Sequence, residues 1–149
     1  MSTQMFDTIL VPTDGSRAAR RAAEHAIELA KASDATVHAM YVMDMGDVDF
    51  VAVPSDIAET RTRMEKKGQG YTDEIAEMAE EAGVECVTVV RSGIPEETIL
   101  EYAHEHGVDL ISMGKRGRSD PDKLLIGSTT QRVVARSDVP VHTIGRRGA

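Results

Sequence analysis

The chain has 149 residues, of which 41% are hydrophobic and 28% charged, a composition typical of one folded domain with a sizeable core. Its formal net charge of −8 argues against a general nucleic-acid binder and against attachment to an anionic membrane surface. Aromatic residues reach only 3% and Trp is absent, which argues against a base-stacking platform for single-stranded nucleic acid.

Cysteine content and hydropathy bear on the compartment in which the protein works. Cys86 is the only cysteine, so no internal disulfide can form, and its place in a predicted strand favours a small core residue. The opening residues lack a basic segment followed by a long apolar run, and no run reaches transmembrane length. We therefore expect a cytoplasmic protein with no membrane insertion.

The first part of the chain predicts a strand, a helix and a second strand. Thr8–Thr13 is a short apolar run, and the Asp14-Gly15-Ser16 turn after it places Ser16 as the helix N-cap. The second strand is predicted at Thr36–Val42. The helix between them has small apolar residues at helical spacing on one face, namely Ala19, Ala22, Ala23, Ala26, Ile27 and Ala30.

The middle of the chain begins with an irregular stretch and continues as a long helix. Residues 44–54 break the pattern and are expected to form a mobile loop or lid. An amphipathic helix is predicted from about residue 56 to residue 81, with Gly83 as its stop. Gly68 and Gly70 weaken the prediction that it is continuous, because each costs up to ~1 kcal/mol relative to Ala. Its apolar stripe consists of Met64, Tyr71, Ile75, Met78, Ala79 and Ala82.

The last part alternates strands with helices. The predicted strands are Glu85–Arg91, Asp109–Met113 and Val139–Ile144, and the predicted helices are Pro95–His106 and Ser128–Arg136. Because most strands are apolar at consecutive positions, we expect a parallel sheet covered by helices on both faces. Ligands of such sheets sit beyond the carboxyl ends of the strands, where the strand order reverses. If the first and fourth strands are neighbours there, Asp14 and Gly114 meet in one crevice.

Glycines recur at fixed intervals between the fourth strand and the last helix. Two residues separate Gly114 from Gly117, and nine residues separate Gly117 from the Gly127-Ser128 pair. Glycine lets backbone N–H groups converge on an anion, and the positive end of the last helix favours an anion as well. Four cations against two carboxylates leave a local charge of +2, from Lys115, Arg116, Arg118, Lys123, Asp120 and Asp122. The stretch therefore predicts a phosphate site in a nucleotide-binding domain.

Alternative interpretations of the polar residues remain beside this one. Asp14 could be a catalytic base, but a ribose contact or a plain Asx-turn is favoured, and Ser128 is interpreted as N-cap and phosphate ligand together. A Walker loop and a GxGxxG turn are not indicated, because the required spacings are missing. His104 and His106 do not share a helix face, which argues against a metal site. Isolated histidines with structural or solvated roles are His25, His38 and His142, and methionines expected in the core or a pocket wall are Met40, Met43 and Met45.

Three stretches together, ILVPTDGS, the glycine spacing and GSTTQRVVARSDVPVHTI, resemble the universal stress proteins of the ATP-binding type over nearly the whole chain. The resemblance implies one domain over residues 1–149 with a Rossmann-like fold of the adenine nucleotide alpha hydrolase-like kind. Its five-stranded parallel sheet has the order 3-2-1-4-5, and two copies pair through the last strand, Val139–Ile144. One departure is the mid-loop Ser119-Asp120-Pro121-Asp122, where small and apolar residues are usual. Its carboxylates could weaken binding or attract Mg²⁺.

The resemblance also implies a set of site residues for ATP or another adenine nucleotide. Near the ribose and adenine these are Pro12, Thr13, Asp14 and the backbone of Val42. Bordering the ribose are Met113 and Gly114, and at the phosphates Gly117, Gly127, Ser128 and Thr129. A Mg²⁺ ion would be shared among the phosphate oxygens.

Three functions follow from this resemblance. The first is a homodimeric, nucleotide-dependent regulatory protein of the stress response. The second is a slow ATPase or phosphotransfer enzyme, for which the sequence supplies cations but no obvious base beyond Asp14. The third is a dimeric interaction module whose nucleotide site does not function. The intact glycine spacing argues against it, and Asp120 and Asp122 argue weakly for it.

Overall fold

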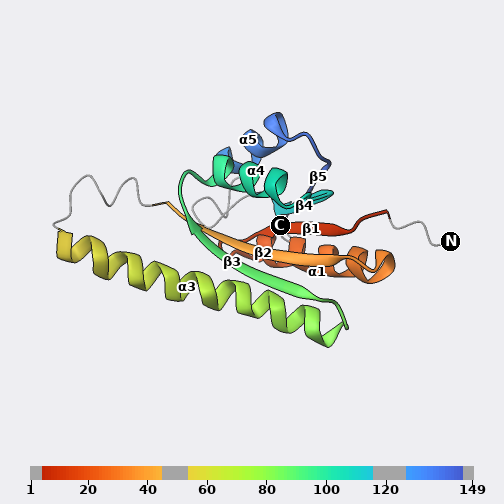
Figure 1. Ribbon diagram of the computed structural model, residues 1–149, viewed down its shortest axis with the longest axis horizontal. Helices are drawn as coiled ribbons and strands as arrows, with labels where there is room; N and C mark the ends of the chain where they lie inside the picture. The colour runs from red at the N-terminus through yellow and green to blue at the C-terminus, as the bar shows by residue number, and fades with distance from the viewer. Residues whose placement is uncertain (1–4, 45–53, 116–126, 146–149) are drawn as a thin grey trace.

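A five-stranded parallel sheet forms the centre of the molecule, shown in Figure 1. The computed structural model describes residues 5–44, 54–115 and 127–145. The strand order is β3-β2-β1-β4-β5, which confirms the predicted α/β fold and its topology. The strands are β1 (Thr8–Pro12), β2 (Thr36–Met43), β3 (Cys86–Ser92), β4 (Leu110–Gly114) and β5 (Val141–Ile144).

Helices cover both faces of the sheet, as the consecutive apolar residues predicted (Figure 1). One face carries α1 (Arg17–Ser33) and α3 (Pro54–Glu81), and the other carries α4 (Pro95–Glu105) and α5 (Ser128–Arg136). Within the described residues, no helix is long and apolar enough to cross a membrane.

The order reverses between β1 and β4. After β1 the chain adds β2 and β3 on one side, then returns to place β4 on the other side, where Ile9 pairs with Leu110 and Leu10 with Ile111. The carboxyl ends of β1 and β4 therefore meet at the same edge of the sheet, which confirms the expected switch point.

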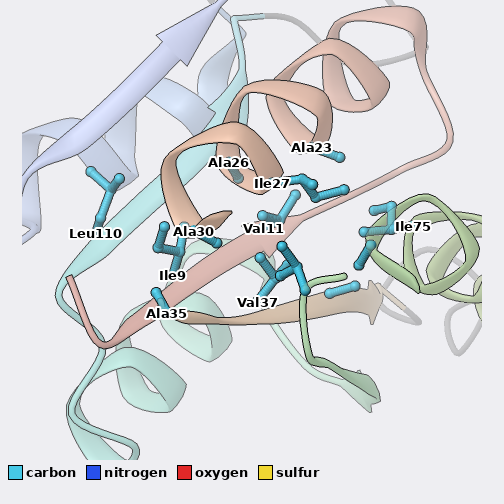
Figure 2. Packing of buried hydrophobic residues seen from close by; sticks show 13 residues of the cluster. Ile9, Val11, Ala23, Ala26, Ile27, Ala30, Ala35, Val37, Ile75 and Leu110 are labelled. Carbon is cyan, nitrogen blue, oxygen red and sulfur yellow. The ribbon is translucent and has the colours of Figure 1, made fainter. Parts of the chain in front are cut away.

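The core has two layers, one on each side of the sheet. Ile9, Leu10 and Val11 are fully buried, and alternate residues of β1 face opposite layers because strand side chains alternate. Figure 2 shows the first layer, where the side chains of α1 lie over those of β1 and β2. Those of Ala23 and Ala26 are so small that α1 packs close to the sheet. This small apolar face is the one that the sequence predicted.

Every predicted strand needs a small boundary correction. β1 ends one residue early at Pro12, while β3 (Cys86–Ser92) and β4 (Leu110–Gly114) are each shifted by one residue. β2 extends to Met43, one residue beyond its predicted end. β5 begins at Val141 and not at residue 139, because Ser137 and Val139 form a turn in which the Ser137 hydroxyl donates to the Val139 carbonyl at 2.7 Å. The predicted single helix is confirmed for α3, which runs unbroken past Gly68 and Gly70. Of the predicted loop at 44–54, residues 45–53 lie outside the described residues.

The prediction that three histidines are isolated is wrong. His38 Nδ1 lies 2.6 Å from the Tyr102 hydroxyl, and His142 Nδ1 lies 3.1 Å from Ser112 Oγ. The rings of His25 and His142 are 5.6 Å apart. These contacts join residues far apart in sequence, so local pattern could not indicate them. Cys86 is half-buried against the core as expected, and burial raises the pKa of its thiol.

Candidate functional site

A cavity of about 230 Å³ opens at the carboxyl ends of β1 and β4, where the strand order reverses. Its walls come from β1, β2 and β4 and from the beginnings of α1, α4 and α5. Nine of the ten residues predicted for the site line it: Pro12, Thr13, Asp14, Val42, Met113, Gly114, Gly127, Ser128 and Thr129. The tenth, Gly117, lies outside the described residues, as do Arg116, Arg118, Asp120, Asp122 and Lys123.

The turn between β1 and α1 places Asp14 at the cavity. The Thr13 N–H donates to the Met40 carbonyl at 2.8 Å, which continues the β1–β2 ladder one residue beyond the strand. Asp14 Oδ1 then accepts from the Ser16 N–H at 2.9 Å, so the predicted Asx-turn is confirmed. Ser16 Oγ accepts from the Ala19 N–H at 3.2 Å and caps α1, also as predicted. Gly15 permits this turn because its φ is +78°.

Gly114 ends β4 against the first turn of α1. A Cβ built on Gly114 would lie 2.8 Å from the backbone of both Ala18 and Ala19, closer than real Cβ atoms approach. The Gly114 carbonyl accepts a hydrogen bond from the Thr130 hydroxyl at 2.9 Å. Glycine is therefore needed here to let the sheet, α1 and α5 converge on one point of the cavity wall.

The beginning of α5 forms the polar end of the cavity. The chain leaves the sheet at Lys115 and returns at Gly127, whose N–H donates to the Lys115 carbonyl at 2.7 Å. The prediction that Ser128 caps the helix is wrong: Gly127 is the N-cap, and Ser128 is already the first helical residue. Because first-turn N–H groups have no partner within their own helix, Ser128 and Thr129 present donors and a positive dipole end to the cavity.

The opposite wall is apolar. Met40, Ile99 and Met113 line it, and each is at most 6% exposed. Met40 was expected in the core or a pocket wall and is in both. Ile99 and Pro95 were not predicted, although their spacing of four at the start of a helix after β3 would place both on one face at the carboxyl edge.

Comparison with known proteins agrees with this arrangement. The model of the universal stress protein family matches residues 5–145. The chain belongs to the universal stress protein family.

Its relatives and structural neighbours include proteins of Methanocaldococcus jannaschii and Arabidopsis thaliana. Universal stress protein MJ0531 of Methanocaldococcus jannaschii is 37% identical over 142 residues, which cover 92% of this chain and 81% of that protein. The solved structure of MJ0577 from the same organism superposes with a TM-score of 0.87 at 28% identity, covering 97% and 99% of the two chains. An Arabidopsis thaliana family protein with AMP bound shares the fold at 21% identity, with a TM-score of 0.72 over 95% and 93%.

Two further observations concern the surroundings of the cavity in this universal stress protein: the pKa of Tyr41 and an ion pair between α4 and α5. Burial raises the pKa of the Tyr41 hydroxyl, and the nearby Tyr71 and Asp14 raise it further. The Arg132 guanidinium donates to Glu96 at 3.1 Å, which ties the start of α4 to α5 beside the cavity. Among the described lining residues Asp14 is the only carboxylate. In the described parts of the chain, no group of three His, Cys, Asp or Glu residues could hold a metal ion.

Proposed function

We propose that this universal stress protein binds an adenine nucleotide, with ATP and its Mg²⁺ as the expected form, in the cavity at the switch point. The observation that carries the proposal is that three features converge on one cavity: an apolar wall, a helix N-terminus and Asp14, the one carboxylate among the described lining residues. These are the three surfaces that a base, a sugar hydroxyl and a phosphate chain require.

Each part of the nucleotide has a matching surface. Met40, Ile99 and Met113 offer an apolar face for the base, and Asp14 offers an acceptor for a sugar hydroxyl or the adenine amino group. The first turn of α5 offers N–H groups to the phosphates. The described residues supply a single lining carboxylate, so a Mg²⁺ ion would be held chiefly by phosphate oxygens.

The proposal extends to the assembly and the role of the protein. Residues 1–149 would form one nucleotide-binding domain, and two copies would pair through β5 in the cytoplasm, where occupancy would change conformation or partners. β5 supports pairing because it lies at an edge of the sheet that the described residues form, next to β4 alone. The Pro140 and Ile144 carbonyls accept from β4, so the backbone groups of Val141 and Thr143 point to the other side.

A proline substitution tests this assembly. Thr143→Pro removes an outward N–H while the β4 ladder keeps its bonds, so it should convert a dimer to a monomer in light scattering. Thr143→Val, which keeps the backbone donor, should remain dimeric. A monomeric protein before any substitution would contradict the proposal.

Calorimetric titration of the emptied protein with Mg-ATP, Mg-AMP and Mg-GTP tests the nucleotide site. We expect Asp14→Ala to weaken ATP binding by roughly 10- to 100-fold, because a hydrogen bond to a charged group contributes about 1.5–3 kcal/mol. Asp14→Asn can still accept the Ser16 N–H and separates loss of charge from loss of the turn.

The matched control lies at the opposite end of β1. Asp109 Oδ2 accepts the N–H groups of Asp7 and Thr8 at 2.7 and 2.9 Å, far along the sheet from the cavity. Asp109→Asn should leave nucleotide affinity unchanged. Equal losses for both aspartates, or no binding by the unaltered protein, would contradict the proposed site.

The enzyme alternative is separated by a different assay. Steady phosphate release by the pure protein, abolished by Asp14→Ala, would favour slow ATP hydrolysis. Persistence of cellular activity after a bulky substitution at Gly117 that prevents nucleotide binding would favour the interaction module instead.

A further inference from the structure

Helix α3 touches the turn that carries Asp14 through a tyrosine seated on a glycine. A Cβ built on Gly15 would lie 2.5 Å from Cζ and 2.7 Å from Cδ1 of Tyr71, so the ring fills the space where a side chain would be. Gly15 also has a φ of +78°, which L side chains rarely adopt. The turn therefore needs glycine both for its backbone and for this contact with α3.

A second tyrosine makes the complementary contact. Tyr41 of β2 rests on Gly68 of α3, where a Cβ would lie 2.7 Å from the ring's Cγ. The rings of Tyr41 and Tyr71 meet edge to face, with centroids 5.8 Å apart and planes at 61°. The Tyr71 ring of α3 therefore packs on Gly15, and the Tyr41 ring of β2 packs on Gly68. Together these contacts hold α3 against both the β1–α1 turn and β2.

These contacts adjoin the candidate nucleotide site. Tyr41 and Asp14 both line the cavity, and the charge of Asp14 is one cause that raises the pKa of the Tyr41 hydroxyl, after burial and Tyr71. An ion pair between Arg20 and Glu74 joins α1 to α3 one turn further along. A ligand that holds Asp14 would therefore act on a turn already packed against α3.

We propose that Tyr71 is a positioning residue for the nucleotide, whose ring holds the Asp14-Gly15-Ser16 turn and couples occupancy of the cavity to helix α3. The proposal rests on the proposed nucleotide function. A glycine turn without this ring would sample more backbone states, and binding would have to select the competent one. Because coupling between sites is reciprocal, a nucleotide that fixes the turn also fixes α3.

Helix α3 should change its hydrogen exchange when a nucleotide binds. The side chains described between residues 56 and 67 are exposed or half-exposed, and in Figure 1 the yellow start of α3 runs past the end of the sheet. Nucleotide binding that steadies the helix at Tyr71 would then change how readily its backbone opens.

The test combines titration with hydrogen exchange on the 149-residue chain, emptied of nucleotide. We expect Tyr71→Ala to weaken Mg-ATP binding about tenfold, within the range typical of coupled sites, and Tyr71→Phe to restore most of the affinity because it keeps the ring. Met78→Ala is the matched control, since Met78 lies two turns further along α3 and packs against the core. It should leave affinity unchanged.

Hydrogen exchange supplies a readout that loss of stability alone would not produce. In the unaltered protein and in Tyr71→Phe, Mg-ATP should slow exchange in α3 peptides around residues 65–78, and in Tyr71→Ala this protection should be absent. Tyrosine emission gives a second signal, because the chain has three Tyr and no Trp, and two of the three form this contact.

Several outcomes would overturn the inference. Binding by the unaltered protein with no change of exchange in α3 would refute the coupling while leaving the nucleotide site intact, and this result needs no variant that folds poorly. Equal affinity losses in Tyr71→Ala and Met78→Ala would reduce Tyr71 to a structural residue. No binding of Mg-ATP by the unaltered protein would refute the proposed function and the inference with it.

Discussion

Two glycines of α3, two residues apart, should respond to alanine in opposite directions. Gly70 is exposed, and a Cβ built on it meets no atom within 4 Å. Gly70→Ala should therefore raise the free energy of unfolding by about 0.5–1 kcal/mol, the helical preference of Ala over Gly. Gly68 is buried, and its Cβ would lie 2.7 Å from Cγ and 2.9 Å from Cε2 of Tyr41. Since Cγ is the ring atom nearest the backbone, rotation of the ring about the Cβ–Cγ bond cannot relieve this contact, and Tyr41 must change its χ1 rotamer or β2 must shift.

The magnitude for Gly68→Ala follows from two opposing effects. Overpacking of this kind costs about 1–3 kcal/mol, and helix preference returns about 1 kcal/mol. The net expectation is a loss of roughly 1 kcal/mol, so the two variants should differ by roughly 2 kcal/mol.

Urea unfolding followed by helical circular dichroism measures both variants against the unaltered protein. Tyr41→Ala with and without Gly68→Ala isolates the cause. In the Tyr41→Ala background the steric conflict is gone, and Gly68→Ala should raise the free energy of unfolding. If both alanines stabilise the unaltered protein equally, Tyr41 does not occupy the space above Gly68 and the account of α3 packing is refuted.

Three further substitutions should have the following effects. Gly114→Ala should lower the free energy of unfolding by about 1–3 kcal/mol in urea melts, because the new Cβ meets backbone that cannot yield. Arg132→Ala should cost about 1–2 kcal/mol, because it leaves the Glu96 carboxylate, 8% exposed, without its guanidinium, and Glu96→Gln together with it should recover part of that loss. Burial, then the charge of His106, lowers the pKa of His38, so the folded protein binds fewer protons than the unfolded chain. His38 therefore contributes stability that is full above the ordinary pKa of ~6.5 and is lost as pH falls from there through the lower pKa of the folded state, so His38→Gln should flatten the decline below pH ~6.5.

Local pattern was enough for the elements and the α/β class because its signals were strong and consistent, while the strand order was predicted from the family resemblance. Ile9, Leu10 and Val11 are apolar in a row and fully buried, as a strand covered on both faces requires. The alanine face of α1, the cap at Ser16 and the stop at Gly83, where φ is +74°, are local features and were predicted.

The errors arose where a distant residue decides the structure. Gly68 weakened the prediction of a continuous α3, and the pattern could not show that this glycine leaves room for the Tyr41 ring of β2. Spacing of four predicts that Tyr102 and His106 share a helix face, but it could not show that His38 of β2 contacts both.

Some residues of the candidate site were predicted from the sequence and others were not. Asp14, Gly114 and Ser128 were predicted because glycine spacing and family resemblance mark them, and the cavity brings them together. Pro95 and Ile99 were missed because their spacing places both on one face of α4 but does not show that this face lines the cavity.

The most direct test of the central claim is to identify what the protein carries. The protein would be purified without added nucleotide and denatured, and any released small molecule would be identified by mass spectrometry. The emptied protein would then be titrated with Mg-ATP. An adenine nucleotide among the released molecules, or saturable binding of Mg-ATP that Asp14→Ala weakens, is the predicted result. No released adenine nucleotide and no titration signal would contradict the account of the cavity as a nucleotide site.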